Sequence, residues 1–409
     1  MRGVPNRSLW CIMKMADECV QGNGPAAGGS GGRRESFGLL GPAMFLLTGC
    51  ATVVPAPELD GLRQRLVADC VAGLFSGVVA VKKDERIVFL HSCGHSDVER
   101  RAPIRPDARY KLFSTSKPLT ATAVLKLVEL GRMELEAPLR AYVPDVPAEW
   151  GSITIRQLLQ HRSGVPELTE KLLDTYRQGS RSHEQAMAHL LGSLSEEEKK
   201  LSGAPGQGWR YSNFSYELLA LAAARAGRAP FDRVLHKLVF APAGMRTANV
   251  ELIEAKGEME AAPSPGLVRG FAGTPADLRP ALSYSFVQQG AGAVHASYED
   301  LMAFDKALSR GRLLSPAMQA RMETEAVSVN DGVRYGYGWM IRSVGPCTYW
   351  QHSGGNNGYT SEFARAPDAR VAIVVLSNLE FAKVGEIRSM AMKAMLESPE
   401  NSRRCVEGA

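Results

Sequence analysis

The chain has 409 residues, of which 45% are hydrophobic and 22% are charged, an ordinary balance for a folded globular protein of one large domain or two. Residues 1–49 hold five of the 48 basic and three of the 43 acidic side chains, so 43 basic and 40 acidic side chains follow them. No dense run of lysine and arginine occurs in that remainder, and therefore no nucleic-acid partner is expected.

The first 50 residues have the order of a processing segment. Residues 20–33 are of low complexity and cannot contribute to a packed core. Arg33 and Arg34 then precede an apolar stretch over residues 37–47, which is too short to span a bilayer and is followed by small residues and Cys50. We interpret residues 1–49 as a low-complexity N-terminus and a secretory signal. The alternative is a buried apolar segment with a chance cysteine.

The ending Leu47-Thr48-Gly49-Cys50 resembles the lipobox of bacterial lipoproteins, in which the cysteine is lipidated and becomes the first residue. This resemblance implies that Cys50 carries lipid chains and that residues 1–49 are removed. It also implies a periplasmic protein anchored to a membrane. Ala51 is not the aspartate associated with retention in the inner membrane, which favours the outer membrane. The long stretch before Arg33 is unusual for such a signal and favours a start codon further along the chain.

Hydrophobic periodicity predicts the elements of the remaining chain in order. A helix is expected over residues 58–72, and two β-rich runs, 77–82 and 87–92, then form a hairpin. Further helices are predicted over residues 120–130, 183–191, 216–226 and 230–239. Ser182 with Gln185 is typical of a capping box at the start of the second of these. Strands follow over residues 338–343, 349–351, 361–365 and 371–377, and a last helix over residues 385–396.

Strands at both ends of this region, with helices between them, indicate one sheet assembled from distant parts of the chain. We therefore expect an α/β fold of the α+β type with two lobes over residues 58–400, preceded by a short linker over residues 50–57. The sheet lobe is assigned to residues 58–113 and 290–400, and an inserted all-helical lobe to residues 114–289. A cleft between two such lobes is a natural place for a substrate.

The cysteines and histidines indicate no metal site. Four cysteines follow Cys50, namely Cys70, Cys93, Cys347 and Cys405, and they allow up to two disulfides with three pairings open. Because C-x-x-C spacing and an H-E-x-x-H motif are both missing from the sequence, we expect no metal or other cofactor. His183 and His189 are interpreted as part of a solvated helix face, and His161 as structural.

The first segment that carries chemistry is Phe113-Ser114-Thr115-Ser116-Lys117, at the start of an apolar helix. Ser114 and Lys117 are three residues apart, so on a helix they project from one face and can touch. A neutral lysine amine in a desolvated pocket can take the proton of a serine hydroxyl, and a helix N-terminus stabilises nearby negative charge. The S-x-x-K spacing alone is weak evidence, because a chain of this length carries about one by chance.

Two later segments add candidates. Tyr211 and Asn213 lie on one loop before a helix and could supply a proton carrier and an amide donor, although Tyr-x-Asn taken alone is typical of an ordinary turn. His352-Ser353-Gly354-Gly355 precedes a buried strand. Its glycines allow a close approach of the backbone, so that a backbone N–H could form half of an oxyanion hole.

In this order, the three segments resemble the serine β-lactamase and penicillin-binding-protein superfamily, specifically its class C-like branch. That branch holds class C β-lactamases, D-alanyl-D-alanine carboxypeptidases and family VIII-type esterases. Four further segments look like parts of the family, at residues 110–114, 158–166, 335–339 and 374–378, so the resemblance covers about residues 60 to 396. It implies a β-lactamase/transpeptidase-like fold, an antiparallel sheet flanked by N- and C-terminal helices with an inserted helical lobe.

The resemblance also implies a role for each motif residue. Ser114 would be the acylated nucleophile and Lys117 its proton acceptor. Tyr211 would share the base role and pass a proton to the leaving group, while Asn213 would position the substrate. The backbone N–H groups of Ser114 and Gly355 would form the oxyanion hole.

The third motif departs from the class C pattern. His352 stands where those β-lactamases carry a lysine whose cation helps to bind the substrate carboxylate, and Ser353 beside it could bind substrate or fix the turn. Histidine is shorter and can be neutral or charged near pH 7. This departure favours an esterase or a broad acyl hydrolase over a β-lactamase or a D,D-peptidase.

Three hypotheses follow. The preferred one is a lipid-anchored serine hydrolase that cleaves an ester or amide through an acyl-enzyme on Ser114. The second is a D,D-carboxypeptidase or weak β-lactamase acting on a substrate derived from peptidoglycan. The third is a non-catalytic cell-wall or protein-binding module on the same fold, which loss of Ser114, Lys117 or Tyr211 would have marked.

Overall fold

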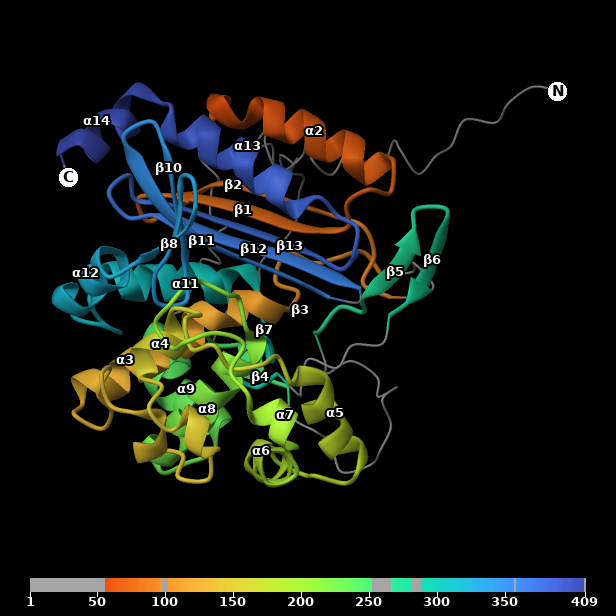
Figure 1. Cartoon of the computed structure of the whole chain (residues 1–409). Helices are drawn as coiled ribbons and strands as arrows, with labels where there is room; N and C mark the ends of the chain where they lie inside the picture. The colour runs from red at the N-terminus through yellow and green to blue at the C-terminus, as the bar shows by residue number, and fades with distance from the viewer. Residues whose placement is uncertain (1–55, 98–101, 252–265, 282–287, 357, 408–409) are drawn as a thin grey trace, which may run out of the picture. The chain divides into compact units, whose positions relative to one another are not determined.

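The computed structural model describes residues 56–97, 102–251, 266–281, 288–356 and 358–407 (Figure 1). The predicted signal over residues 1–49, the lipidation site Cys50 and most of the linker lie outside these residues. Within the described part, no helix combines the length and the apolar character needed to cross a bilayer.

The centre of the fold is an eight-stranded sheet in the order β2-β1-β13-β12-β11-β10-β9-β8. All of its neighbouring strands pair antiparallel, which confirms the expected fold class. The first and last parts of the described chain meet here, because β1 pairs with β13 from Gly77 opposite Ser377 to Lys83 opposite Val371. The strands are β1 (Gly77–Lys83), β2 (Arg86–Cys93), β8 (Val327–Asn330), β9 (Val333–Tyr335), β10 (Met340–Val344), β11 (Cys347–Asn356), β12 (Tyr359–Ala366) and β13 (Val371–Ser377).

Side chains alternate between two cores on the faces of this sheet, as the period of two in a strand requires. Val78 of β1 belongs to the core shared with the helices below the sheet in Figure 1, and Val79 to the core above it. The upper layer consists of α2 (Asp60–Val71), α13 (Val384–Leu396) and α14 (Pro399–Glu407). The predicted helices at 58–72 and 385–396 and the strand at 371–377 are thereby confirmed.

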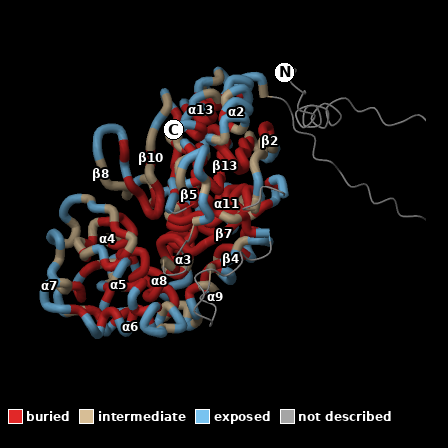
Figure 2. The backbone as a smooth tube through the Cα atoms, turned by 90° about the vertical axis from the view of Figure 1, so that its right-hand side faces the viewer, coloured by how far each residue is buried: buried red, intermediate tan, exposed pale blue. Residues whose placement is uncertain are grey.

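The layer below the sheet holds α11 (Tyr298–Ser309) and the inserted helices (Figure 1). The inserted helices are α3 (Lys117–Glu129), α4 (Ile155–Leu159), α5 (Thr169–Arg177), α6 (His183–Gly192), α7 (Glu196–Lys199), α8 (Asn213–Gly227), α9 (Phe231–Leu235) and α10 (Ala241–Ala243). Figure 2 shows that the buried backbone continues from the sheet into α3 and α8. These two buried helices carry Lys117 and Asn213, respectively, at their first positions.

The remaining elements are short. A three-stranded sheet joins β3 (Tyr110–Lys111), β7 (Val294–Ala296) and β4 (Asn249–Val250), and β5 (Phe271–Thr274) pairs with β6 (Asp277–Pro280). A π-helical turn over His236–Phe240 separates α9 from α10, and α12 spans Pro316–Thr324. In the three-stranded sheet, β7 brings residues near 290 against the turn that holds Ser114, since Leu112 N–H donates to Val294 O at 2.9 Å.

Both disulfides join elements of the sheet lobe. Cys70 of α2 bonds to Cys93 of β2, and Cys347 of β11 bonds to Cys405 of α14. The three pairings left open by the sequence are thus reduced to one. Each bridge fixes a helix of the upper layer to a strand of the sheet.

Two local predictions are wrong at the start of α6. The Ser182 side chain accepts from Gln185 N–H at 3.2 Å, but the Gln185 side chain accepts from Arg181 N–H instead of closing a capping box. His183 does not belong to a solvated face, because its side chain is only 8% exposed and its Nε2–H donates to Glu217 O at 3.3 Å. His189 on the same helix is exposed, as expected.

Candidate active site

Ser114 lies in a 3₁₀ turn, Phe113–Ser116, that leads directly into α3. Phe113 has a φ of +47°, a left-handed conformation that costs a bulky residue free energy and is found mostly at functional sites. Phe113 and Thr115 are buried, whereas Ser114 is partly exposed. The turn therefore presents the Ser114 side chain to solvent from an otherwise buried segment.

The sheet holds this turn from one side. Thr115 Oγ1–H donates to His352 O of β11 at 3.2 Å, and Ser361 Oγ–H of β12 donates to Leu112 O at 2.8 Å. A Cβ at Gly354 would lie 2.0 Å from Leu112 O, so the third motif passes too close to the turn for any residue but glycine. Gly354 thus allows the close approach that the sequence predicted, whereas a Cβ at Gly355 would meet only ordinary contacts.

The Lys117 amine lies between three oxygen atoms. Its Nζ is 3.0 Å from Ser114 Oγ, 2.8 Å from Asn213 Oδ1 and 3.2 Å from Ala291 O. Burial lowers the pKa of Lys117 to about 7, and the negative charges of Glu217 and Glu167 oppose that effect. A lysine with such a pKa has a neutral amine in much of its population near pH 7 and can accept the proton of Ser114.

Tyr211 lies against the same pair. Lys117 Nζ is 4.7 Å from the centroid of the Tyr211 ring, and the Tyr211 hydroxyl is hydrogen-bonded to the Ser114 side chain. Burial raises the pKa of Tyr211 above its ordinary value, while the bond to Ser114 opposes that effect. The free site therefore holds a protonated tyrosine, which makes Lys117 the stronger candidate for the first proton acceptor.

His352 is buried and belongs to a chain of hydrogen bonds rather than to the open site. Its Nδ1–H donates to Ser353 O at 2.7 Å, and its Nε2 accepts from the Tyr335 hydroxyl at 3.3 Å. Tyr335 in turn accepts from His161 Nε2–H at 3.0 Å, while His161 Nδ1 accepts from Ser212 N–H. Each ring has one nitrogen that donates and one that accepts, so both imidazoles fit the neutral form.

The pKa of His352 also indicates a neutral ring. Burial lowers the pKa of His352 to about 3, the charge of Lys117 lowers it further, and the bond to Ser353 O opposes both. The ring is therefore uncharged at neutral pH and cannot act as a cation for a substrate carboxylate. His161, interpreted as structural from the sequence, also packs against Tyr211, with ring centroids 4.4 Å apart and ring planes tilted by 38°.

The remaining predicted residues lie at the rim. Ser353 and Gly355 are exposed on β11, and Asn213 is partly exposed at the start of α8. Gly355 of β11 pairs with Thr360 of β12. The structure thus brings together Ser114, Lys117, Tyr211, Asn213 and the third motif from three separate segments of the chain.

Two acidic residues near the site are missing from the sequence prediction. Glu167 is exposed, and its Oε2 accepts from Asn213 N–H at 2.7 Å and from Phe214 N–H at 3.3 Å. Glu217 is fully buried on α8. A signal for Glu217 was present, because it is the one acidic residue in the otherwise apolar and small run from Phe214 to Ala224. Glu167 stands in a loop whose sequence gives no such signal.

Comparisons with known proteins agree on one family. The sequence model of the family described as Beta-lactamase matches residues 63–394. Penicillin-binding protein 4* of Bacillus subtilis (strain 168) is 29% identical over 317 residues, 75% of this chain and 68% of that protein. A D-aminopeptidase of Brucella anthropi is 28% identical over 327 residues, 78% of this chain, but the match spans only 58% of that protein's length.

Solved structures show the same fold. A penicillin binding protein from Bacillus halodurans has a TM-score of 0.69 at 23% identity, over 83% of this chain and 99% of that one. The D-amino acid amidase from Ochrobactrum anthropi SV3, complexed with L-phenylalanine amide, has a TM-score of 0.68 at 23% identity, over 85% of this chain and 99% of that one.

Proposed function

The chain belongs to the beta-lactamase family and is a serine hydrolase, and from that premise we propose that it cleaves an ester or an amide through an acyl-enzyme on Ser114. The observation that carries the proposal is the buried Lys117 amine, 3.0 Å from Ser114 Oγ and with a pKa lowered by burial to about 7. The third hypothesis, a non-catalytic module, loses its basis, because Ser114, Lys117 and Tyr211 are present and in contact.

The reaction follows from these positions. Lys117 Nζ accepts the Ser114 proton as Oγ forms a bond to the substrate carbonyl carbon, and the carbonyl oxygen becomes negative. The backbone N–H groups of Ser114 and Gly355 are assigned to that oxyanion. Collapse of the intermediate breaks the bond to the leaving group, which receives a proton through the Tyr211 hydroxyl as Tyr211 is reprotonated from Lys117. Water then attacks the acyl-enzyme by the same route in reverse and restores Ser114.

The neutral His352 disfavours substrates that carry a carboxylate beside the scissile bond. Asn213 and Ser353 are assigned to the substrate's polar groups, but His352 offers no cation for a carboxylate beside the scissile bond. We therefore expect a carboxylate-bearing β-lactam or a D-Ala-D-Ala peptide to be a poorer substrate than an ester or amide without that carboxylate. Stable labelling of Ser114 by a fluorescent penicillin, or release of D-Ala from a pentapeptide, would support the peptidoglycan alternative instead.

The charge at the rim favours a substrate with a free ammonium group. Glu167 is exposed, contacts Asn213 N–H, and its charge acts on Lys117 and Tyr211. A carboxylate at this place attracts a cation and repels an anion. Relatives that carry the names D-aminopeptidase and D-amino acid amidase support the same class, so we propose an amino-acid amide or ester with a free α-ammonium.

Replacing Glu167 should alter selectivity more than activity. We expect Glu167→Gln to lower kcat/KM for D-phenylalanine amide about 10-fold, as the loss of one charge-assisted contact of about 1.4 kcal/mol would give. The uncharged p-nitrophenyl acetate should be affected much less, because it lacks the ammonium group. Glu170→Gln, an exposed glutamate at the start of α5, is the matched control. Equal losses for both substrates would show that Glu167 only supports the start of α8.

We further propose that the protein is exported and lipid-anchored through Cys50 in a bacterial periplasm. The support is the sequence order of Arg33-Arg34, an apolar stretch and a lipobox-like ending. In a bacterial host, the wild-type chain should incorporate an alkyne fatty acid and sediment with membranes, and Cys50→Ala should do neither. An unlabelled wild-type chain that keeps residues 1–49 would refute this proposal.

A further inference from the structure

A carboxyl group is buried behind the reactive lysine. The Glu217 side chain is 0% exposed, on α8, one turn after Asn213. Its Oε1 accepts from Ala291 N–H at 2.9 Å, and its Oε2 accepts from Gly290 N–H at 3.3 Å. A fully buried carboxyl group is costly unless hydrogen bonds compensate for the lost water. These two backbone bonds supply that compensation, and they fix both oxygens onto one turn of the chain.

The same turn holds α3 from its other side. Gly290 O accepts from Thr120 Oγ1–H at 2.6 Å, and Ala291 O accepts from Lys117 Nζ at 3.2 Å. A Cβ at Gly290 would lie 2.0 Å from Tyr216 O, so the turn lies directly on the backbone of α8. Glu217 on α8 is thus connected to Lys117 on α3 through a single residue, Ala291.

We propose that Glu217 is a positioning residue for the Lys117 base. It fixes the Gly290–Ala291 turn, so that the Ala291 carbonyl directs the lysine amine toward Ser114, and its carboxylate supplies the negative charge behind that amine. Neither role is visible in the three motifs, because Glu217 lies outside them, is fully buried and reaches Lys117 through Ala291. The inference rests on the proposed function, since it assigns a role in activating Ser114.

Glu217 and Lys117 each influence the pKa of the other, so the effect of the Glu217 carboxylate on Lys117 can be measured. Burial lowers the pKa of Lys117 to about 7, and the negative charge of Glu217 is the largest influence that opposes it. Burial raises the pKa of Glu217, whereas the two N–H bonds that its oxygens accept and the charge of Lys117 favour the carboxylate form. The other ionisable groups that face the two residues are Glu167, Tyr176, His183, Tyr211, Tyr216, His161 and His352.

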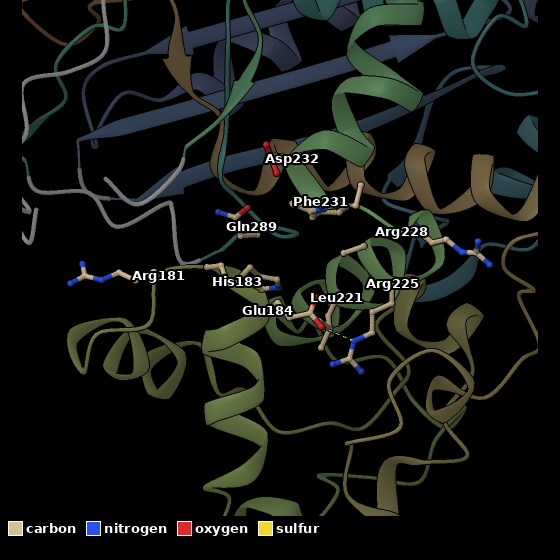
Figure 3. Close-up of a pocket in the computed structure, with 13 residues that line it drawn as sticks. Arg181, His183, Glu184, Leu221, Arg225, Arg228, Phe231, Asp232 and Gln289 are labelled. Carbon is tan, nitrogen blue, oxygen red and sulfur yellow. Dashed lines mark hydrogen bonds and ion pairs between the residues drawn. The ribbon is translucent and has the colours of Figure 1, made fainter. Parts of the chain in front are cut away.

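His183 adds no charge to this arrangement. It lies between Glu217 and a cavity of about 510 Å³ in the helical lobe, whose lining includes His183 and Gln289 (Figure 3). Burial lowers the pKa of His183 to about 4, so the ring is neutral near pH 7. Among the described residues, Lys117 is therefore the cation whose charge acts on Glu217.

The test is the rate at which a fluorophosphonate probe labels Ser114, measured from pH 5 to 10 by intact mass. Glu217→Gln keeps the size of the side chain but removes its charge and one acceptor. Its plateau rate should fall about 10-fold because the amine is less well held. The labelling rate should rise with pH as Lys117 loses its proton, and this rise is the acid limb. In Glu217→Gln the limb should move to lower pH by about 0.5 to 1 unit, because the variant lacks the negative charge that favours the ammonium form of Lys117.

Three further variants separate position from charge. Thr120→Val removes the other bond to the turn and should lower the plateau without moving the acid limb. Glu217→Asp keeps the charge but shortens the side chain, so it should lower the plateau and leave the limb near its wild-type pH. Glu184→Gln, on the exposed side of α6, should match the wild type in both. A merely structural role for Glu217 would lower the folded fraction but not move the limb.

The outcomes distinguish the two proposals. A wild-type chain that the probe does not label at Ser114 would refute the proposed function. Normal wild-type labelling with an unmoved limb and plateau in Glu217→Gln would refute this inference alone. If Glu217→Gln is not recovered folded, Glu217→Asp decides, because a wild-type plateau in that variant overturns the positioning role and a lowered plateau supports it.

Discussion

Ser114→Ala should reduce hydrolysis of p-nitrophenyl acetate by at least about 10³-fold, toward the rate of the uncatalysed reaction. The reason is that, in the proposed reaction, Ser114 Oγ is the only atom of the protein that becomes bonded to the acyl group. The variant keeps the turn, because the hydrogen bonds that fix it are made by Thr115 and Ser361 and not by the Ser114 side chain. Its loss of activity would therefore not come from a loss of fold.

Ser116→Ala is the matched control for this variant. Ser116 lies in the same turn, but its Oγ accepts from Val294 N–H at 3.2 Å and is not one of the three partners of Lys117 Nζ. Its turnover per folded molecule should stay within about threefold of the wild type, since a single neutral hydrogen bond contributes only about 1 kcal/mol. Turnover that survives in Ser114→Ala would mean that another residue carries the acyl group.

Lys117→Met should have the second largest effect. Methionine fills a similar unbranched volume but cannot accept a proton, so kcat/KM should fall by about 10²- to 10⁴-fold. The wild-type rate should rise with pH through about 7, because burial lowers the pKa of Lys117 to that value and only the neutral amine is a base. This limb should be absent in Lys117→Met. The measurement is kcat/KM for p-nitrophenyl acetate from pH 5 to 9.

Lys126→Met controls for the loss of a lysine on the same helix. Lys126 is near the end of α3 and pairs with Glu129 at 3.0 Å, away from the site. It should keep both the rate and the limb. An acid limb near pH 7 that persists in Lys117→Met would assign that ionisation to another group and contradict the role of Lys117.

The sequence predicted best those elements whose burial leaves a pattern along the chain. The apolar run at β13 is buried on both faces, and α2 places Leu62 and Leu66 on one side. The predicted ends of both elements therefore lie within two residues of the observed ends. By contrast, β11 was predicted as three residues and has ten. Its glycines have low strand propensity, and pairing with β10 and β12 on either side overrides that propensity.

The contact between Ser114 and Lys117 was predictable because the two residues are three positions apart in the chain, and a family resemblance supplied the order of the other motifs. What no local pattern could supply is contact between distant segments. Glu217 and Ala291 are 74 residues apart, and His161 and Tyr335, which joins it to His352, are 174 residues apart. Likewise, the charge state of His352 depends on its burial, which the motif alone does not reveal.

We propose that Ser114 forms a covalent acyl intermediate. The most direct test of this proposal is the intact mass of the protein after exposure to an activated ester, a fluorophosphonate and a penicillin, followed by peptide mapping. We predict one added acyl or phosphonyl group on Ser114 with the first two reagents, turnover of the acyl adduct, and little stable penicillin adduct. No adduct with any reagent, or an adduct on a residue other than Ser114, would contradict the account.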